Sequence, residues 1–198
     1  MKRVLIVGAG IGQVFLARKI KARGHYLVTV TLPGNQPVID IADKVRYENV
    51  FNKEGVHAIA REEKVDAVIS DQNDMMMPTV AYVAEHMGLP GNGIKVVHDY
   101  CDKNAFRDNC DKVGIPVPKH CSVSEVAVPE GMKDVPLPWV VKPADAQSSV
   151  GVEKVNTLEE YFVAIKAAIE ISKTHTAIVE EFFKGQELVA EGFIYEGE

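Results

Sequence analysis

The chain has few cysteines and no cysteine-rich motif. Its 198 residues include three cysteines, Cys101, Cys110 and Cys121, which are odd in number and lack the paired spacing of zinc ligands. We therefore expect neither a disulfide framework nor a metal site in this chain. A reducing, cytoplasmic setting fits this composition best.

Long hydrophobic runs and an excess of positive charge are also missing. No stretch approaches the roughly 18 apolar residues that a membrane helix requires. The basic start at residues 1–3 is typical of a signal peptide, but the apolar run after it ends at Gly8, which favours a buried strand. The 28 acidic residues exceed the 22 basic ones, and the formal net charge of −6 repels a polyphosphate backbone. We expect neither nucleic acid nor a membrane as a partner.

The first half of the chain alternates short apolar runs with helical segments. Such alternation is typical of βαβ units, which build a parallel sheet. We therefore expect an α/β, Rossmann-like domain over residues 1–93. The strands are expected at residues 2–7, 26–32, 45–47 and 67–70, and the helices at residues 12–23, 53–63 and 78–87.

The alternation stops at the glycine- and proline-containing residues 88–92, and the second domain is expected over residues 94–198. Asp102 is placed to cap a helix that runs to about residue 113. This domain is expected to be α+β, with a hairpin formed by the strands on either side of the loop after Lys142. Its strands are expected at residues 119–123, 138–142, 151–155, 177–183 and 187–195, and its long helix at residues 158–172.

The last third of the chain has the order of parts that a nucleoside triphosphate pocket needs. Lys142 ends an apolar strand, where its ammonium group can meet phosphate oxygens as a point charge. The small, polar loop at residues 144–150 can turn backbone N–H groups toward the same anion. The apolar strand at residues 177–183 then brings carboxylates and backbone groups. This order predicts ATP binding.

The N-terminal glycine cluster is an incomplete match to a dinucleotide-binding fingerprint. Gly8, Gly10 and Gly12 follow a strand and open a helix, as that fingerprint requires. Its last glycine is replaced by Gln13, and the second strand ends at residues 31–33 without an acidic residue for a ribose hydroxyl. A tight turn is the favoured interpretation, and an NAD(P)-dependent oxidoreductase is the alternative.

Taken in one order, these motifs resemble those of the ATP-grasp superfamily. The resemblance is greatest to its carboxylate–amine ligases, a group that includes the carbamoyl-phosphate synthase large chain and biotin carboxylase. It implies a Rossmann-like domain followed by the first lobe of an ATP-grasp domain. The motifs are Asp102-Lys103, Val141-Lys142-Pro143, Gly151-Val152, Glu180-Glu181-Phe182-Phe183 and Glu187.

The resemblance implies a role for each matching residue on the phosphate side. Lys103 resembles the first phosphate-binding lysine of the family, and Lys142 resembles the second, which contacts the α and β phosphates. Ser148, Ser149 and Gly151 lie in what resembles the flexible loop over the phosphates. This loop is poorer in glycine than many loops of the family.

The resemblance also implies residues for the base and the sugar. Glu180 and Phe183 match the segment that reads the adenine edge, and Glu187 matches the residue that accepts hydrogen bonds from the ribose. The family's magnesium ligands lie in the second lobe, beyond the end of this chain. We therefore expect a fragment of a longer ligase, inactive alone, whose parent uses ATP and Mg²⁺ to join a carboxylate to an amine.

The sequence motifs identify no catalytic side chain, no specific carboxylate or amine, and no oligomeric state. A non-catalytic nucleotide-binding module is a further alternative to the ligase.

Overall fold

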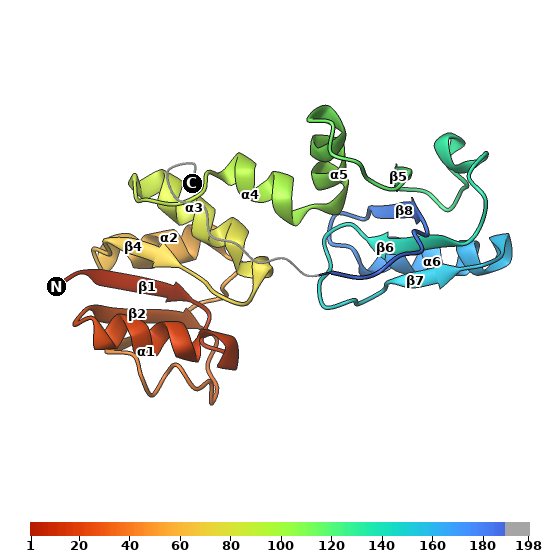
Figure 1. Cartoon of the computed structure of the whole chain (residues 1–198). Helices are drawn as coiled ribbons and strands as arrows, with labels where there is room; N and C mark the ends of the chain where they lie inside the picture. Colours follow the sequence, from red (N-terminus) through yellow and green to blue (C-terminus); the bar gives the residue numbers. More distant parts are fainter. Residues whose placement is uncertain (189–198) are drawn as a thin grey trace. The chain divides into compact units, whose positions relative to one another are not determined.

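The computed structural model describes residues 1–188, which form two compact units (Figure 1). The first unit contains Met1–Ile115 together with Ala144–Ser149, and the second contains Pro116–Pro143 and the chain from Val150 onward. The boundary between these compact units lies closer to the C-terminus than the domain boundary expected between residues 93 and 94. That boundary concerns the domains of the family, and it stays a prediction.

The first unit contains a four-stranded parallel sheet in the order β3-β2-β1-β4. The expected Rossmann-like alternation is therefore present. Its strands are β1 (Arg3–Val7), β2 (Tyr26–Thr31), β3 (Lys44–Tyr47) and β4 (Ala67–Ile69). Its helices are η1 (Ile11–Gln13), α1 (Val14–Ala22), α2 (Lys53–Glu62), η2 (Asp74–Met76), α3 (Met77–Met87), α4 (Ile94–Cys101) and α5 (Lys103–Lys112).

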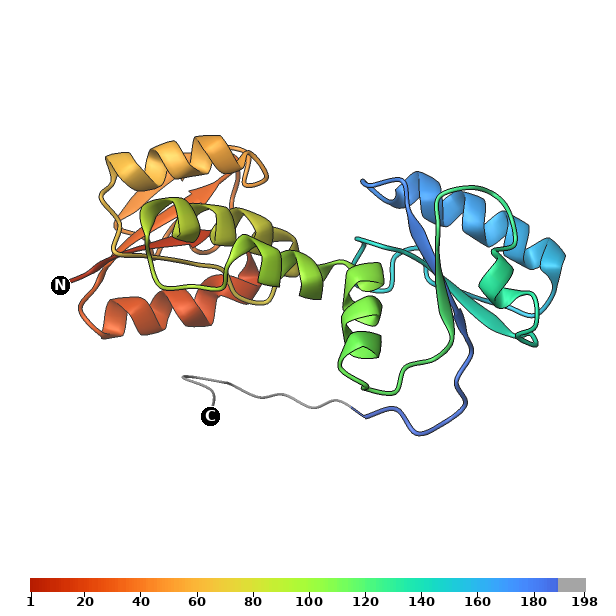
Figure 2. The same cartoon turned by 90° about the horizontal axis from the view of Figure 1, so that it is seen from above.

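Alternating side chains of β1 build the two apolar layers of this unit. Leu5 and Val7 belong to a core with residues of α2 and α3, while Val4 and Ile6 belong to a core with residues of α1. Successive residues of a strand point to opposite faces, so one buried strand supplies both layers. Figures 1 and 2 show α1 on one side of the sheet and α2 and α3 on the other.

Helix α4 was not expected from the sequence. It begins after the glycine-containing residues 91–93, where the backbone N–H of Ile94 donates to the Glu85 carboxylate of α3 at 2.8 Å. A carboxylate from another helix thus satisfies the exposed N–H group at this helix start. The next helix, α5, has the expected cap, because the Asp102 carboxylate accepts from the backbone N–H of Ala105 at 2.9 Å.

The second unit is a four-stranded antiparallel sheet with one long helix. The strand order is β5-β8-β6-β7, and β6 pairs with β7 as the expected hairpin. The expected strand at residues 187–195 begins with Glu187 and Leu188, which are not in a strand, and its other residues lie outside the described part. The elements are β5 (His120–Val123), η3 (Glu130–Met132), β6 (Trp139–Pro143), β7 (Glu153–Val155), α6 (Leu158–Ile171) and β8 (Ala177–Glu181).

Helix α6 covers one face of this sheet. Trp139 and Val141 of β6 and Val179 of β8 pack in one core with Tyr161 and Ile165 of the helix. The rings of Trp139 and Tyr161 meet edge to face, with 5.4 Å between their centroids. The opposite face of the sheet is thereby left for the polar side chains of β6 and β8.

Within residues 1–188, every helix is too short or too polar to reach across a bilayer.

Candidate nucleotide site

Lys142 and Glu180 form an ion pair on the face of the second sheet that lies opposite α6. Strand alternation buries Trp139 and Val141 against α6 and turns Lys142 to the other side. The Lys142 ammonium group donates to the Glu180 carboxylate, which is 5% exposed on the neighbouring strand β8. A phosphate-binding candidate and a base-reading candidate are thus in direct contact.

The strand register places a row of side chains across this face. Lys154 of β7 is opposite Val140 of β6, Val140 is opposite Glu180 of β8, and Glu180 is opposite His120 of β5. Lys142 is two residues beyond Val140, on the same face. The face therefore presents the Lys142 ammonium group beside one buried carboxylate, with the side chain of Lys154 on the same face. A cation at the end of β6 suits an anionic ligand.

In the first unit, Lys103 lies against the loop that follows Lys142 in the chain. Its backbone N–H donates to the Ala144 carbonyl at 3.1 Å, and its ammonium group donates to the carbonyls of Ala144 at 3.3 Å and Ala146 at 2.5 Å. Lys103 comes directly after the capping residue of α5, so the helix start fixes its position. The first lysine thus contacts the phosphate-loop candidate, whereas Lys142 belongs to the other compact unit.

The loop itself has an unusual backbone. Ser148 and Ser149 have φ values of +55° and +58°, in the left-handed region that non-glycine residues seldom adopt, and both are exposed. Gly151 has a φ of +69°, and a Cβ atom there would lie 2.8 Å from Pro143 Cγ and 2.9 Å from Ile171 Cδ1. Glycine at this position therefore lets the chain turn closely over the end of β6.

The chain leaves the sheet directly after Glu180 and Glu181. The backbone N–H of Phe182 donates to the Pro138 carbonyl at 3.1 Å, which continues the β6–β8 pairing by one residue. Phe183 is 75% exposed, and Glu187 is also exposed. Their roles in reading the base and the ribose stay predictions.

The glycine turn of the first unit is filled from within. The Gln13 side chain is 4% exposed, and its amide group donates to the Asp71 carbonyl at 2.5 Å. Cβ atoms built on Gly8 and Gly10 would lie 3.7 Å and 3.2 Å from its Oε1 atom. The residue that replaces the last glycine of the fingerprint thus packs under the turn, which favours the tight-turn interpretation over a dinucleotide site.

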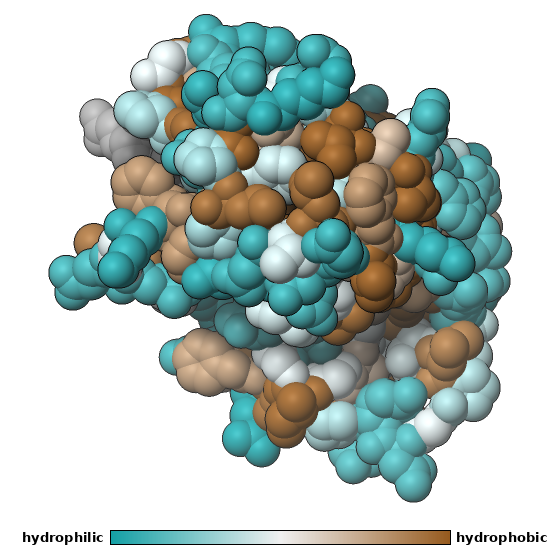
Figure 3. All heavy atoms as spheres, turned by 90° about the vertical axis from the view of Figure 1, so that its right-hand side faces the viewer, coloured by the Kyte–Doolittle hydropathy of each residue, from teal (hydrophilic) through white to brown (hydrophobic). Residues whose placement is uncertain are grey.

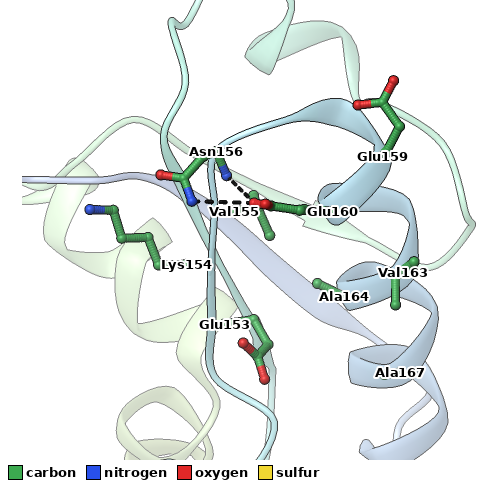
Figure 4. Close-up of a pocket in the computed structure, with 9 residues that line it drawn as sticks. All are labelled: Glu153, Lys154, Val155, Asn156, Glu159, Glu160, Val163, Ala164 and Ala167. Carbon is green, nitrogen blue, oxygen red and sulfur yellow. Dashed lines mark hydrogen bonds between the residues drawn. The ribbon is translucent and has the colours of Figure 1, made fainter.

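A separate open groove lies between β7 and α6 (Figure 4). Its volume is about 650 Å³, and its apolar lining includes Val155, Val163 and Ala164. Figure 4 shows Lys154 pointing away from this groove, and its other charged lining residues are Glu153, Glu159 and Glu160. Three carboxylates make it a poor phosphate site.

Exposed apolar side chains also occur on α6, and Figure 3 shows hydrophobic groups gathered beside hydrophilic ones on the face it draws.

The described residues do not fit a divalent metal ion. Among residues 1–188, no group of three or more His, Cys, Asp or Glu side chains is placed to hold one. Magnesium in proteins binds to carboxylates together with substrate phosphates. We therefore derive no chemical step through a metal from this part of the chain.

Comparison with known proteins shows what this chain is similar to. The family model described as "D-ala D-ala ligase C-terminus" matches residues 110–191. The carbamoyl phosphate synthase large chain of Methanocorpusculum labreanum is 23% identical over 93% of this chain and 19% of its own length. The D-alanine–D-alanine ligase of Haemophilus ducreyi is 35% identical over 52% of this chain and 35% of its own. This chain is related to the ATP-grasp ligases.

The ATP-grasp fold is also shared with solved structures. The biotin carboxylase domain of the Hydrogenobacter thermophilus 2-oxoglutarate carboxylase matches with a TM-score of 0.74 and 18% identity, over 92% of this chain and 44% of that one. That structure is a complex with MgADP, ADP and bicarbonate. The expected fold, a Rossmann-like domain followed by part of an ATP-grasp domain, is confirmed. The chain spans about half the length of that structure and about a fifth of the carbamoyl phosphate synthase chain.

Two features of this sheet face are not apparent from the sequence motifs. The motifs do not include Lys154, although strand alternation from Val155 places it on the face of Lys142. The motifs also assign no role to Phe182, whose ring lies beneath the Lys154 ammonium group, with 3.9 Å between the nitrogen and the ring centroid. The sequence indicates a role for Lys154 in part, because a lysine in an exposed edge strand close to the expected phosphate loop can contact a neighbouring side chain.

Proposed function

We propose that this chain is the ATP-binding portion of an ATP-grasp ligase. The parent protein activates a carboxylate as an acylphosphate and joins it to an amine or a similar nucleophile. A carboxylate oxygen attacks the γ-phosphorus and ADP leaves; the nucleophile then attacks the acyl carbon and phosphate leaves. The parent's activity and substrates are part of the proposal, because the chain spans a minor part of its relatives.

Lys103 and Lys142 bind the phosphates in this proposal. Both ammonium groups have protein partners without nucleotide, the loop carbonyls for Lys103 and Glu180 for Lys142. Phosphate oxygens are stronger acceptors than backbone carbonyls, so bound ATP would draw Lys103 away from the loop. The loop with Ser148, Ser149 and Gly151 would then lie over the phosphates, with Glu180, Phe183 and Glu187 at the base and ribose.

The Lys142–Glu180 pair is the observation on which the proposal rests most. A lysine at the end of β6 and a buried carboxylate on β8 lie side by side on the sheet face away from α6. The complexes with ADP and MgADP of proteins that share this fold support the same ligand class. Magnesium is expected for the parent, with ligands outside the described residues.

Calorimetric titration with ATP tests the proposal. Lys142→Met should weaken binding by about 10- to 100-fold, the value of one charge-assisted hydrogen bond. Lys133→Met is the matched control, because Lys133 is an exposed lysine of the same unit that pairs with Glu130. The fluorescence of Trp139, the single tryptophan, reports that each variant is folded. Equal affinities for the wild type and Lys142→Met would remove Lys142 from the site, and no binding by the wild type would defeat the proposal.

A further inference from the structure

Lys154 and Phe182 form a contact that spans a strand. The Lys154 ammonium group lies 3.9 Å from the centroid of the Phe182 ring, well within the range of a cation–π interaction. Lys154 is in the edge strand β7, whereas Phe182 follows β8, and β6 lies between these two strands. The side chain of Lys154 therefore reaches over the Val140 position to meet the ring.

The register explains why the two groups meet. Lys154 is opposite Val140, and Val140 is opposite Glu180, so all three share one face. Phe182 is two residues beyond Glu180, and its N–H donates to Pro138, so the strand geometry continues and its ring lies on the same face.

We infer that Lys154 is a positioning residue that fixes the segment Phe182-Phe183 through the Phe182 ring, and so fixes the backbone groups that read the base. This inference rests on the proposed ATP site. Phe183 is exposed and the chain leaves the sheet at this point, so the Phe182 ring is a side-chain contact through which the segment can be held. Lys154 acts on the base through Phe182, not on the phosphates by its charge.

The affinities for adenosine, ADP and ATP show whether Lys154 acts through the Phe182 ring or by its charge on the phosphates. Lys154→Met removes the cation but keeps a long apolar side chain, and it should weaken binding of adenosine, ADP and ATP alike, by about two- to fivefold. Lys154→Arg should restore the affinity, because a guanidinium group also binds an aromatic face. A loss that grows with phosphate number and shrinks in high salt would overturn the inference, as would unchanged affinity for all three ligands.

A double-mutant cycle tests the partner. In a Phe182→Leu background, Lys154→Met should have no further effect on affinity, since the ring on which it acts is gone. An equal loss in both backgrounds would show that Lys154 acts on something else. Trp139 fluorescence monitors the fold, because Trp139 lies on the other face of the sheet, within the core.

Two measurements without nucleotide test the role of Lys154 independently of the proposed ATP site. In NMR spectra of the wild type, the ε-methylene protons of Lys154 should be shifted upfield by the Phe182 ring, and Phe182→Leu should abolish the shift. Lys154→Met should speed exchange of the Phe182 amide proton by about two- to fivefold, while exchange in β5 is unchanged. If the wild type binds no nucleotide, the proposed function fails, and these two readouts still decide whether Lys154 holds the segment.

Discussion

The Lys142 ammonium group donates to the Glu180 carboxylate across two neighbouring strands, although 38 residues separate them in sequence. Glu180 is nearly fully buried, while Lys142 is 22% exposed. The two partners of this ion pair therefore differ in exposure: the carboxylate is shielded from water, whereas the ammonium group reaches it.

Lys142→Met should lower the free energy of unfolding of the second unit more than Glu180→Gln does. Removing the cation takes away the ammonium group that pairs with the buried Glu180 carboxylate, which costs about 2 to 4 kcal/mol. Glu180→Gln leaves an ammonium group that water can solvate, and it should cost about 1 kcal/mol. Urea unfolding followed by Trp139 fluorescence measures both. Strictly additive effects in the double mutant would contradict a direct pair.

Gly151→Ala should destabilise the second unit through two separate effects. The positive φ costs about 1 kcal/mol, and the overlap of the new methyl group with Pro143 and Ile171 adds about 1 to 3 kcal/mol. Gly24→Ala is the matched control, since Gly24 also has a positive φ but its Cβ would meet no atom within 4 Å. Thermal unfolding of the two variants should show the greater loss for Gly151→Ala; equal losses would mean that the neighbouring side chains relieve the overlap without cost.

The stability of the first unit should depend on pH through Glu63. Burial raises the pKa of this carboxyl group, but hydrogen bonds and charge from Lys44 and Arg46 outweigh burial and hold the pKa below its ordinary value. Arg3 also donates to it, at 2.9 Å. With a depressed folded-state pKa, the stabilisation is complete above the unfolded-chain pKa of about 4.3 and is lost as pH falls through the folded value.

Glu63→Gln should therefore cost about 1 to 3 kcal/mol at pH 7 and much less at pH 3. Urea unfolding of the wild type and the variant at pH 7, 5 and 3 measures this difference. Glu62→Gln is the control, because Glu62 binds the same Arg46 but is 65% exposed, so it should have little effect at any pH. A Glu63→Gln difference that stays constant with pH would rule out the carboxylate's charge as the cause.

Gln13→Gly should test the alternative function directly. It restores the last glycine of the dinucleotide fingerprint, yet it removes a buried amide group that donates to Asp71. We expect a loss of about 1 to 2 kcal/mol in the free energy of unfolding and no gain in NADH fluorescence enhancement. Tight NADH binding by the wild type or the variant would reopen the oxidoreductase alternative.

Local patterns were sufficient to predict most elements of the fold. Apolar runs such as that of β1, and the Asp102 cap of α5, depend on residues close together in sequence, and the structure has both. Helix α4 could not be predicted in this way, because the N–H group of its first residue, Ile94, is satisfied by Glu85 of another helix. Most strands and helices follow from hydrophobic periodicity. The start of α4 depends on a carboxylate of another helix, so periodicity does not predict it.

The sequence by itself determined the order of a phosphate-binding lysine, a small polar loop and an acidic strand, since each part is local and chemically distinct. The tertiary structure alone decided that Lys142 pairs with Glu180, that Gln13 fills the glycine turn, and that Lys154 reaches Phe182. The reason is strand order: β8, the last strand within residues 1–188, lies beside β6, and no local pattern encodes which strands become neighbours.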